Sequence, residues 1–503
     1  MYANVQSKVV IVGAGFGGIA AAIELQRHGF SDITILEKAT EPGGTWFHNS
    51  YPGAACDVPS HLYSYSFAQR RDWTRLCSPQ EEILRYLQGV SRTYGLDRIT
   101  VPGSTVSSCV WDDEDLQWTV TTTDGRTYDA GAVVLATGQL HQPAFPRLQD
   151  AESFEGHSFH SAEWDHEYDL TGKRVAVIGT GASAVQFVPE IAKQVAALSV
   201  FQRSGNWFLN RKNRPYPALA MKAIDRIPGL QSARRRFLYH YGEVLTAAIR
   251  HPNTLGRLVY FRSASFMRSQ LKDPEVRAKA WPDYTFGCKR VLFSSHYLPA
   301  LQRPNVDLVT DRVTGLTPAG VRTEDGREHP VDCIIYGTGF RTNDFMFPMQ
   351  VTGTDGRDLA TDWEGGAHAH LGISMPGFPS LFVMYGPNTN TSGGSIIVYL
   401  EAQAQYIRQA LETVRDRGAR ALMVRADVES ASDAALQQQF AGTAWTLCDS
   451  WYRTDEGRIV ANWPGYMREY EAATRQLDPA QFAYIGMSGD VATESLPVET
   501  SSH

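Results

Sequence analysis

Several features that particular protein classes require are missing from this chain of 503 residues. None of its six cysteines forms a Cys-x-x-Cys pair, so zinc ribbons and dithiol redox centres lose their usual signature. No uninterrupted apolar run reaches the roughly 18 residues that a transmembrane helix needs. Positive charge is not in excess either: the formal net charge is −7, which disfavours a nucleic-acid-binding protein that works through bulk charge.

The composition that is present is that of an ordinary globular protein, with 43% hydrophobic and 20% charged residues. At about 100–200 residues per domain, the length predicts two to four domains. The first apolar strand is expected at Val9, which leaves no room for a secretory leader. We therefore expect a cytoplasmic protein in a reducing compartment, with every cysteine a free thiol. The six cysteines are Cys56, Cys77, Cys109, Cys288, Cys333 and Cys448.

A strand, a glycine-rich turn and a helix open the chain. The β-branched run Val9–Val12 is typical of a strand buried in a parallel sheet. In the turn that follows, Gly13 permits a tight bend, Gly15 lets the backbone approach a pyrophosphate, and Gly18 lets helix and strand pack closely. Glu37 ends the second strand, where a carboxylate can accept hydrogen bonds from both ribose hydroxyls. This spacing predicts a dinucleotide site, with the helix expected at residues 19–28.

The same unit recurs in the middle of the chain, with one difference. Gly179 and Gly181 occupy the turn, Ala184 is the third small residue, and a helix is expected at residues 185–194. The next strand ends in Gln202-Arg203 and carries no acid. A guanidinium there can pair with a 2′-phosphate, so NADPH is favoured over NADH; a surface arginine without a role is the alternative. Hydride from NADPH needs an acceptor, and FAD in the first module satisfies that need.

A second kind of repeat accompanies these two units. Asp124-Gly125-Arg126 precedes the apolar run Ala132–Leu135, and Asp325-Gly326-Arg327 precedes Cys333–Tyr336. Because Asp-Gly is a strong hairpin signal, each repeat predicts a β-hairpin that feeds a strand returning to a glycine beside a nucleotide.

These repeats predict an α/β fold with two Rossmann-like dinucleotide-binding domains, for FAD and for NADPH, and a helical insertion. Pro228-Gly229 and His251-Pro252-Asn253 break the insertion into several helices, whose arginine run Arg234–Arg236 indicates a solvated face or an anion-facing lid rather than a membrane contact. The expected segments are residues 1–145 and 335–486 for the FAD domain (the latter with a C-terminal cap), 146–213 and 284–334 for the NADPH domain, 214–283 for the insertion, and 487–503 for a disordered tail.

Two longer fingerprints give the sequence a family resemblance. Gly43-Gly44-Thr45-Trp46 is followed after four residues by Tyr51-Pro52-Gly53 and after three more by Asp57. The second pattern is Phe154-x-Gly156-x-x-x-His160-x-x-x-Trp164-Asp165. Both resemble fingerprints of type I Baeyer–Villiger monooxygenases, and the likeness runs from about residue 8 to residue 484. Flavin-containing monooxygenases that oxygenate nitrogen or sulfur resemble the second pattern but usually lack its aromatic-acidic ending.

The resemblance implies an enzyme in which NADPH reduces FAD and O₂ then forms a C4a-peroxyflavin. That species attacks a ketone carbonyl and inserts one oxygen atom beside it, which gives an ester or a lactone. The implied partners are a small-molecule ketone and O₂, with no nucleic acid and no transmembrane segment, and the chain is expected as a monomer or homodimer. Three alternatives stay open: a nitrogen- or sulfur-oxygenating enzyme, an uncoupled NADPH oxidase or electron-transfer flavoprotein, and a non-catalytic flavin redox sensor.

The resemblance also implies roles for three polar residues. Arg290 follows Lys289 just before an apolar strand and would stabilise the anionic peroxide and the oxyanion of the ketone adduct. Lys289 would join Arg203 at the 2′-phosphate, and Asp57 would orient Arg290. A structural ion pair is the alternative for Arg290, and a turn residue is the alternative for Asp57.

Other positions match the family at its cofactors or between its domains. Contact with the cofactors is implied for Gly44, Thr45, Trp46, Tyr63, Val106 and Asn388, although Tyr63 and Val106 could equally be core residues. We interpret His160 as a latch between domains rather than as a proton relay, and Trp164 as packing. Trp451 resembles a tryptophan on a loop that covers the family's NADP, with a buried core residue as the alternative.

The sequence departs from the family at two places. Many relatives carry arginine before the cysteine of the Tyr-Pro-Gly motif, where this chain has Ala55. Relatives often place histidine in the flavin-side loop at the position of Gly393. Both changes put the substrate scope in doubt more than the fold.

Overall fold

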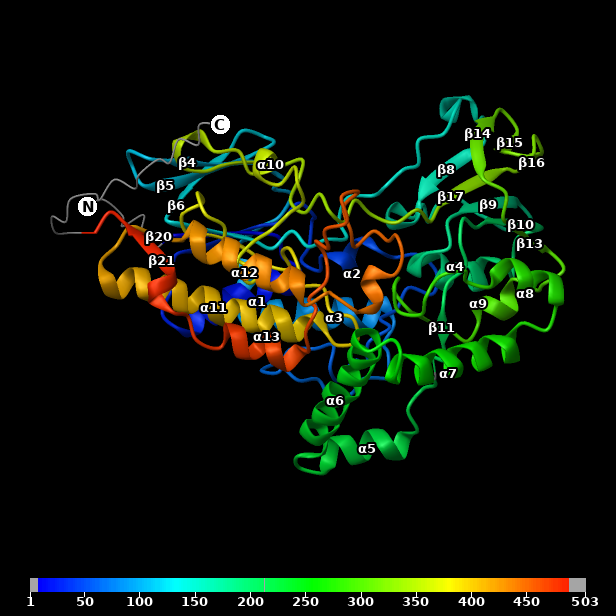
Figure 1. Cartoon of the computed structure of the whole chain (residues 1–503), viewed down its shortest axis with the longest axis horizontal. Helices are drawn as coiled ribbons and strands as arrows, with labels where there is room; N and C mark the ends of the chain where they lie inside the picture. The colour runs from blue at the N-terminus through cyan, green and yellow to red at the C-terminus, as the bar shows by residue number, and fades with distance from the viewer. Residues whose placement is uncertain (1–7, 212, 488–503) are drawn as a thin grey trace.

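The chain folds into two α/β modules with a group of helices beside them (Figure 1). A computed structural model describes residues 8–211 and 213–487. The first module is built on a parallel sheet in the order β19-β7-β1-β2-β3, and the second on a parallel sheet in the order β13-β10-β9-β17-β8. Both orders place the strand before the glycine turn, β1 or β9, in the middle of the sheet.

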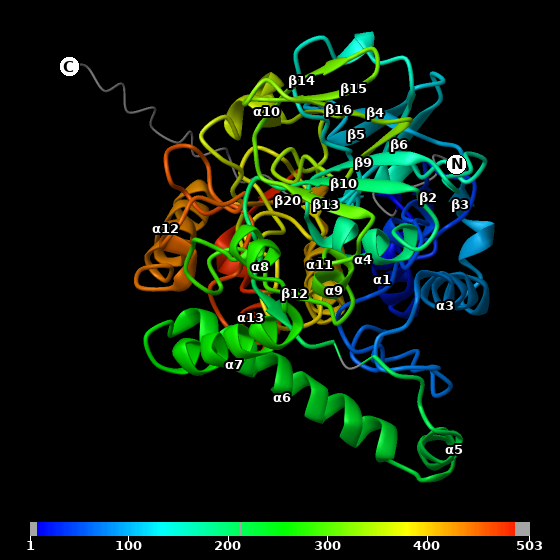
Figure 2. The ribbon, with the colours of Figure 1, turned by 90° about the vertical axis from the view of Figure 1, so that its right-hand side faces the viewer.

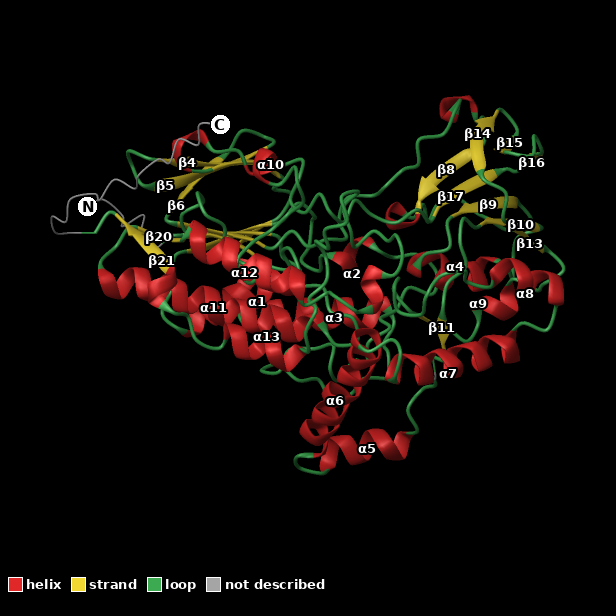
Figure 3. Ribbon diagram, viewed as in Figure 1, coloured by secondary structure: helices red, strands yellow, loops and turns green. Residues whose placement is uncertain are grey.

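The first sheet is covered on both faces because its central strand is apolar throughout. In β1 (Val9–Val12), Val9 and Ile11 face α1 (Phe16–Arg27) and α11 (Ile396–Arg417), whereas Val10 and Val12 face a mixed sheet on the other side. Figure 3 shows these layers. The other strands of the sheet are β2 (Ile33–Leu36), β3 (Thr100–Val101), β7 (Ala132–Leu135) and β19 (Leu381–Val383), and the covering sheet consists of β4 (Val106–Asp112), β5 (Gln117–Thr122), β6 (Thr127–Ala130) and β18 (Gln350–Thr352).

The second module repeats this layering on a smaller scale. In β9 (Arg174–Ile178), Val175 and Val177 share a core with α4 (Ala182–Ile191), and Ala176 and Ile178 share a core with a three-stranded sheet. The other strands of the parallel sheet are β8 (His157–His160), β10 (Ala197–Phe201), β13 (Val306–Val309) and β17 (Cys333–Tyr336), and the covering sheet consists of β14 (Val313–Thr317), β15 (Gly320–Thr323) and β16 (Glu328–Pro330).

Both nucleotide-type helices begin earlier than the sequence predicts. The expected starts are residues 19 and 185, but α1 begins at Phe16 and α4 at Ala182. The residues before them, Gly15 and Gly181, have extended backbones and act as the N-caps. The first turn of each helix therefore lies within the glycine motif itself, and its free N–H groups point out of that motif.

The two predicted hairpins are confirmed. Antiparallel β5 and β6 flank the turn at Gly125, and antiparallel β15 and β16 flank the turn at Gly326. The glycine φ angles are +84° and +81°, in the left-handed region that favours glycine. In each turn the preceding threonine hydroxyl donates to the aspartate, Thr122 to Asp124 and Thr323 to Asp325.

The insertion forms four helices, α5 (Ala218–Arg226), α6 (Leu230–Arg250), α7 (Leu255–Gln270) and α8 (Pro274–Ala280). The breaks on either side of α6 fall where the sequence predicts them, whereas the break between α7 and α8 was not predicted. Figure 2 shows α5, α6 and α7 along one side of the molecule. The interpretation of Arg235 as solvated or anion-facing is wrong. Its guanidinium donates to the carbonyls of His61, Leu62 and Ser64 at 2.8–3.1 Å, which fastens α6 to the first module.

The remaining elements connect these layers. They are α2 (Thr45–His48), α3 (Gln80–Thr93), α9 (Tyr297–Ala300), α10 (Leu359–Asp362), α12 (Ala426–Gln438), α13 (Met467–Thr474), β11 (Phe208–Leu209), β12 (Leu292–Phe293), β20 (Ala421–Val424) and β21 (Phe482–Ile485), with single 3-10 turns at Leu96–Arg98, Ala151–Ser153, Ser161–Glu163, Thr354–Gly356, Ala444–Thr446 and Pro479–Gln481. Strand β17 crosses the expected boundary at residue 334, and the domain limits stay predictions. The predicted disordered tail lies, after Met487, outside the described residues.

The cysteines correct one expectation from the sequence. Cys288 and Cys448 form a disulfide, so the prediction that every cysteine is a free thiol is wrong for these two. The other four are free and buried, and burial raises the pKa of Cys77 to about 11 and of Cys109 and Cys333 to about 12. Within residues 8–211 and 213–487, none of the helices combines the length and apolar character needed to cross a membrane.

Candidate active site

A cavity of about 1890 Å³ lies where the two modules and the insertion meet. Its wall is built from loops that follow strands of both sheets and from one side of α6. Predicted site residues on this wall are Thr45, Trp46, Asp57, Tyr63, Gly179, Gly181, Arg203, Lys289 and Arg290. The fold thus brings together residues that are up to 245 positions apart in the sequence, from Thr45 to Arg290.

The first glycine turn has the shape that a dinucleotide requires. Gly13 has a φ of +104°, and a Cβ atom there would lie 2.6 Å from the carbonyl oxygen of Ala136. A Cβ atom on Gly44 would lie 2.9 Å from the Cα atom of Gly15. The absence of side chains at Gly13 and Gly44 therefore keeps the turn open as a cradle for a ligand. Gly18 has no room for a side chain either, because its Cβ atom would overlap the carbonyl of Gly13. These residues fit the diphosphate of FAD.

Glu37 completes the first cradle from the end of β2. Its buried carboxylate accepts hydrogen bonds from the backbone N–H groups of Ala14 at 2.6 Å and Ala39 at 2.8 Å. An ionised carboxylate offers about four acceptor positions, so both oxygens keep one for a ribose hydroxyl. The donor and acceptor set therefore fits the adenosine half of FAD as the sequence predicts.

The second glycine turn has the same geometry as the first, but the strand next to it is followed by an arginine instead of a glutamate. Gly179 has a φ of +108°, and a Cβ atom there would overlap the carbonyl oxygen of Gly337, while Ala184 is fully buried. Arg203 is exposed on the cavity wall after β10, where a bound 2′-phosphate could reach it. Lys289 lies with its Nζ atom 4.6 Å from the centre of the Tyr284 ring. The two cations on this wall fit a phosphorylated dinucleotide.

An ion pair joins the two modules at the cavity. The Nη2 atom of Arg290 lies 2.7 Å from Oδ2 of Asp57, and the side chains remain 46% and 20% exposed. Burial alone would raise the pKa of Asp57, but the guanidinium of Arg290 outweighs it and holds the pKa below its ordinary value. In return, the carboxylate raises the pKa of Arg290 above its ordinary value. Both groups are therefore charged throughout the neutral pH range.

The loop that carries Asp57 is held by the second module. Gln186 of α4 accepts hydrogen bonds from the Tyr51 hydroxyl and the Ala55 N–H and donates one to the Ala55 carbonyl, at 2.8–3.2 Å. Gly53 has a φ of +81°, and a Cβ atom there would lie 2.8 Å from the carbonyl oxygen of Gln186. The Tyr51-Pro52-Gly53 motif thus serves to dock this loop onto α4.

Sequence reasoning missed the hydroxyls that face the ion pair. Tyr385 and Tyr452 line the cavity, and burial raises the pKa of both, that of Tyr385 to about 12. The Tyr385 hydroxyl donates to Asn390 at 2.9 Å, and its backbone φ is +58°. The signals were present, since Tyr385 lies three residues before Asn388 and Tyr452 directly follows Trp451, and both of those residues match the family. Both tyrosines stay protonated at neutral pH, and the single hydroxyl proton of Tyr385 is engaged by Asn390.

Known proteins resemble this chain over nearly its whole length. A family model described as pyridine nucleotide-disulphide oxidoreductase matches residues 10–234. A Baeyer–Villiger monooxygenase of Pseudomonas aeruginosa is 41% identical over 478 residues, which cover 94% of this chain and 91% of that protein. One of Streptomyces coelicolor is 42% identical over 483 residues, which cover 95% and 92%. The chain belongs to the Baeyer–Villiger monooxygenases.

Solved structures agree with this family in fold and cofactors. The closed crystal structure of cyclohexanone monooxygenase matches with a TM-score of 0.86 and 28% identity, over 95% of this chain and 99% of that one. The structure of OTEMO in complex with FAD and NADP also matches with a TM-score of 0.86, at 25% identity and the same coverage. The predicted fold class, activity and cofactors are confirmed: this Baeyer–Villiger monooxygenase depends on FAD and NADPH.

Eight predicted cofactor residues of this Baeyer–Villiger monooxygenase are not on the cavity wall. Six of them belong to or adjoin the two glycine cradles described above: Gly13, Gly15, Gly18, Glu37, Gly44 and Ala184. The other two, Val106 and Asn388, lie elsewhere. Val106 is buried in β4 among the residues between the first sheet and its covering sheet. Asn388 is buried in the flavin-side loop and uses its amide to donate to the carbonyls of Ile459 at 2.7 Å and Asn462 at 3.0 Å. This contact fastens the loop to the C-terminal segment. Direct cofactor contact by either residue stays a prediction.

Aromatic residues in the fingerprints have mainly packing contacts. Trp46 donates from its indole to the Tyr63 hydroxyl at 3.2 Å, and both side chains line the cavity. Trp164 packs between Phe159 and Phe187 of the second module. Trp451 is 39% exposed on the cavity wall, so the alternative of a buried core tryptophan does not fit it.

His160 lies at the junction between the modules. It is buried at the end of β8, its Nδ1 atom accepts from the Ala162 N–H at 3.1 Å, and its ring packs beside Phe145 and Phe340. Residues 143 and 340 pair with each other where the chain crosses between the two sheets. This position is compatible with the predicted latch, and burial lowers the pKa of His160, which favours the neutral imidazole.

The structure explains the glycine that replaces the family's frequent histidine. Gly393 packs directly against Gly242 of α6, where a Cβ atom on Gly393 would overlap the Gly242 carbonyl and lie 2.9 Å from the Cβ atom of Leu245. A Cβ atom on Gly242 would in turn lie 2.7 Å from the Gly393 carbonyl. A histidine at position 393 would therefore require α6 to move away from the flavin-side loop.

Proposed function

We propose that Arg290 stabilises the negative charge that develops on the reacting oxygen atoms when this monooxygenase converts a ketone to an ester or lactone. The observation that supports this most is the ion pair of Arg290 with Asp57, which lies on the wall shared by both modules. A guanidinium stays charged at all relevant pH values and offers directional donors, which suits an oxyanion better than a lysine does.

In this proposal the chain's own residues bind, orient and shield. When bound, FAD takes hydride from NADPH and supplies the oxygen-activating chemistry. Glu37 holds the ribose of FAD, and Arg203 and Lys289 hold the 2′-phosphate of NADPH. Asp57 is a positioning residue, because it contacts Arg290 through one oxygen and leaves the other guanidinium N–H groups free to turn toward substrate. Trp451 and Tyr452 shield the site from water.

The substrate class follows from the wall that α6 contributes. Phe237, Tyr241 and Val244 are spaced so that they lie on one face of the helix, and all three line the cavity together with Leu238 and Leu245. We propose an apolar ketone as the substrate, with its carbonyl toward Arg290 and its hydrocarbon part along α6.

The test is oxygen transfer from ¹⁸O₂. Purified holoenzyme is incubated with NADPH, ¹⁸O₂ and a panel of ketones of increasing chain length, and the products are weighed by mass spectrometry. The expected result is an ester or lactone that carries one ¹⁸O atom. The Asp57→Asn variant should form the same product with a lower kcat and a nearly unchanged KM for ketone, because only the orientation of Arg290 is disturbed.

A methyl sulfide in the same panel separates the second candidate function. Sulfoxide as the main product would favour heteroatom oxygenation, and steady release of hydrogen peroxide without product would favour an uncoupled oxidase. Either outcome would contradict the proposed ketone specificity.

Two further expectations stay proposals. The four buried free thiols are compatible with a cytoplasmic location, whereas the Cys288–Cys448 disulfide removes the argument that every cysteine is reduced. Fractionation of the source cells tests whether the protein is in the cytoplasm. We propose a monomer or homodimer, which light scattering of the holoenzyme tests.

A further inference from the structure

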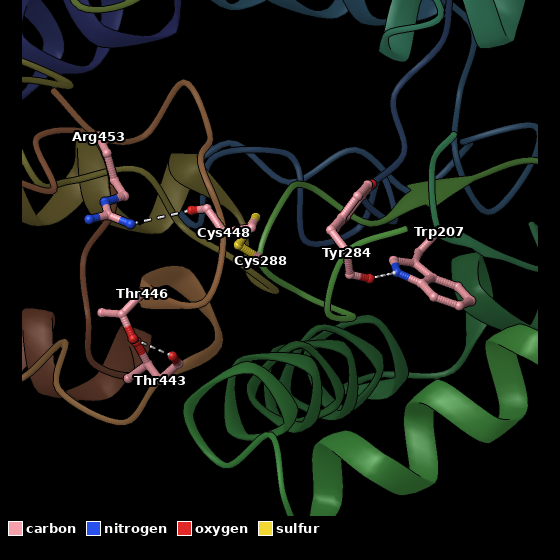
Figure 4. The surroundings of a disulfide bond; sticks show 7 residues. All are labelled: Trp207, Tyr284, Cys288, Thr443, Thr446, Cys448 and Arg453. Carbon is pink, nitrogen blue, oxygen red and sulfur yellow. Dashed lines mark hydrogen bonds between the residues drawn. A yellow bond between two sulfur atoms is a disulfide. The ribbon is translucent and has the colours of Figure 1, made fainter. Parts of the chain in front are cut away.

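The disulfide joins two segments of the active-site wall (Figure 4). Cys288 lies two residues before Arg290, and Cys448 lies three residues before Trp451. The two cysteines are 160 residues apart in the sequence, and their Cα atoms are 6.1 Å apart. Lys289 and Arg290 on one side, and residues 449–452 on the other, line the cavity. The covalent bond therefore connects the catalytic arginine's segment to the C-terminal loop of the cavity.

The Cys288 side is held firmly. The Trp207 indole donates to the Tyr284 carbonyl at 2.9 Å, and β12, just after Arg290, pairs with β11. Gly287 has a φ of +84°, and a Cβ atom there would lie 3.0 Å from Ile249 of α6. This segment is thus anchored to the second module and to the insertion.

The Cys448 side is anchored at its far end, because Tyr452 is buried in a small core with Trp445 and Ile249 of α6 and its carbonyl accepts from the Val460 N–H at 2.9 Å. The residues between Cys448 and Trp451 have weaker support. Leu447 and Trp451 are exposed. The Arg453 guanidinium donates to the Cys448 carbonyl at 3.4 Å, and the Asn343 amide donates to the Trp451 carbonyl at 3.1 Å. Such single bonds at a surface contribute little. Beside the packing of Tyr452, the disulfide is therefore the direct covalent connection between this loop and the Arg290 segment.

We propose that the Cys288–Cys448 disulfide is a positioning element for the Baeyer–Villiger reaction. It holds the loop of Trp451 and Tyr452 against the Arg290 segment, so that the cavity stays closed to water while oxygen is transferred. Closure matters because water in such a site diverts the activated oxygen to hydrogen peroxide. This inference rests on the role proposed above for Arg290.

The first measurement establishes the bond in the holoenzyme. Thiol titration of the unfolded chain should give four thiols, and six after treatment with a water-soluble phosphine. In that treatment each sulfur gains one hydrogen atom and the phosphorus takes up the oxygen of water. The test proteins are the Cys288→Ala/Cys448→Ala double variant and the reduced, desalted wild type. Cys333→Ala, which removes a buried thiol of β17 outside this contact, is the matched control.

The second measurement is the coupling of NADPH use to product. In the double variant and in the reduced wild type, ester formed per NADPH oxidised should fall by roughly threefold or more, with hydrogen peroxide rising in step. The KM for NADPH should rise, while flavin reduction at saturating NADPH should change by less than about twofold. Phosphine treatment of the double variant should add nothing, and Cys333→Ala should remain coupled as the wild type is.

Three outcomes would overturn the inference: six thiols in the untreated wild type, unchanged coupling after the bond is lost, or a loss of thermal stability alone. The reduced wild type keeps the test decisive if the double variant does not fold. Failure here is distinguishable from failure of the proposed function. Full ketone turnover by Arg290→Ala would overturn the arginine's role, whereas a fully coupled reduced enzyme would leave that role intact.

Discussion

The two modules use one backbone design for two different nucleotides. In both, a buried β-branched strand leads into a glycine with a φ near +105°, +104° at Gly13 and +108° at Gly179. In both, that glycine packs against the carbonyl of a residue just after the returning strand, Ala136 or Gly337. The modules differ at the end of the neighbouring strand, where the first has Glu37 and the second has Arg203.

The difference teaches where specificity lies in this fold. Glu37 is buried and fixed by two backbone N–H groups, which suits a cofactor that stays bound. Arg203 is exposed and free to follow a ligand that enters and leaves. We expect the shared backbone to bind the diphosphate in both modules, and the residue at the end of the neighbouring strand to select the ribose.

The largest expected effect arises where the modules meet. Replacing Arg290 by alanine should lower the rate of ester formation by at least about 10²–10³-fold, because the oxyanion loses its fixed donor. FAD should stay bound, and NADPH should still reduce it, since neither glycine cradle is touched. Stopped-flow absorbance of the flavin and chromatography of the product measure the two parts separately. Arg290→Lys, which keeps the charge without the forked donors, should recover part of the activity.

A smaller effect is expected in the first module. Glu37→Gln should raise the dissociation constant of FAD by roughly 10- to 100-fold, because an amide has one acceptor oxygen where the carboxylate has two charged ones. Flavin fluorescence after dilution of the holoenzyme measures how much FAD dissociates. Glu114→Gln, at an exposed turn, is the matched control, and equal retention of FAD by both variants would remove Glu37 from the cofactor site.

The second module should respond to its own residue in a different way. Arg203→Ala should raise the KM for NADPH by roughly tenfold or more while changing the KM for NADH by less than about twofold, since only NADPH has the 2′-phosphate. Steady-state kinetics with both nucleotides measures this ratio. Arg236→Ala, at an exposed position of α6, should change neither value. An equal rise in the KM for NADPH and for NADH would mean that Arg203 is a surface arginine without a role in binding the 2′-phosphate.

The sequence predicted the features that depend on neighbouring residues, and it missed the contacts between residues that are far apart in the chain. The glycine turns, Glu37, Arg203 and the hairpins could be recognised because a few neighbouring residues determine each of them. The clamp of Gln186 on Ala55 and the disulfide could not, because they join residues 131 and 160 positions apart. Arg235 was misjudged for the same reason: its partners are carbonyl groups of a loop about 170 residues earlier, which no charge pattern reveals.

The smallest expected effect tests whether the repeat is truly equivalent in the two modules. Gly125 and Gly326 occupy matching turns with φ angles of +84° and +81°, and no heavy atom lies within 4 Å of a Cβ atom built on either. Alanine at each position should therefore destabilise only through backbone strain, by about 1–2 kcal/mol. Denaturant unfolding of the holoenzyme, followed by tryptophan fluorescence, measures the change.

The two alanine variants serve as each other's control, because space and backbone angle are matched and only the module differs. Gly103→Ala, also at positive φ in open space but outside both hairpins, gives the strain of an isolated turn. Equal losses of unfolding free energy in all three variants would mean that the strain is local and that the two covering sheets tolerate it equally. A clearly larger loss at Gly326 than at Gly125 would mean that the smaller second module depends more on its hairpin, because it has less apolar surface to compensate for the strain.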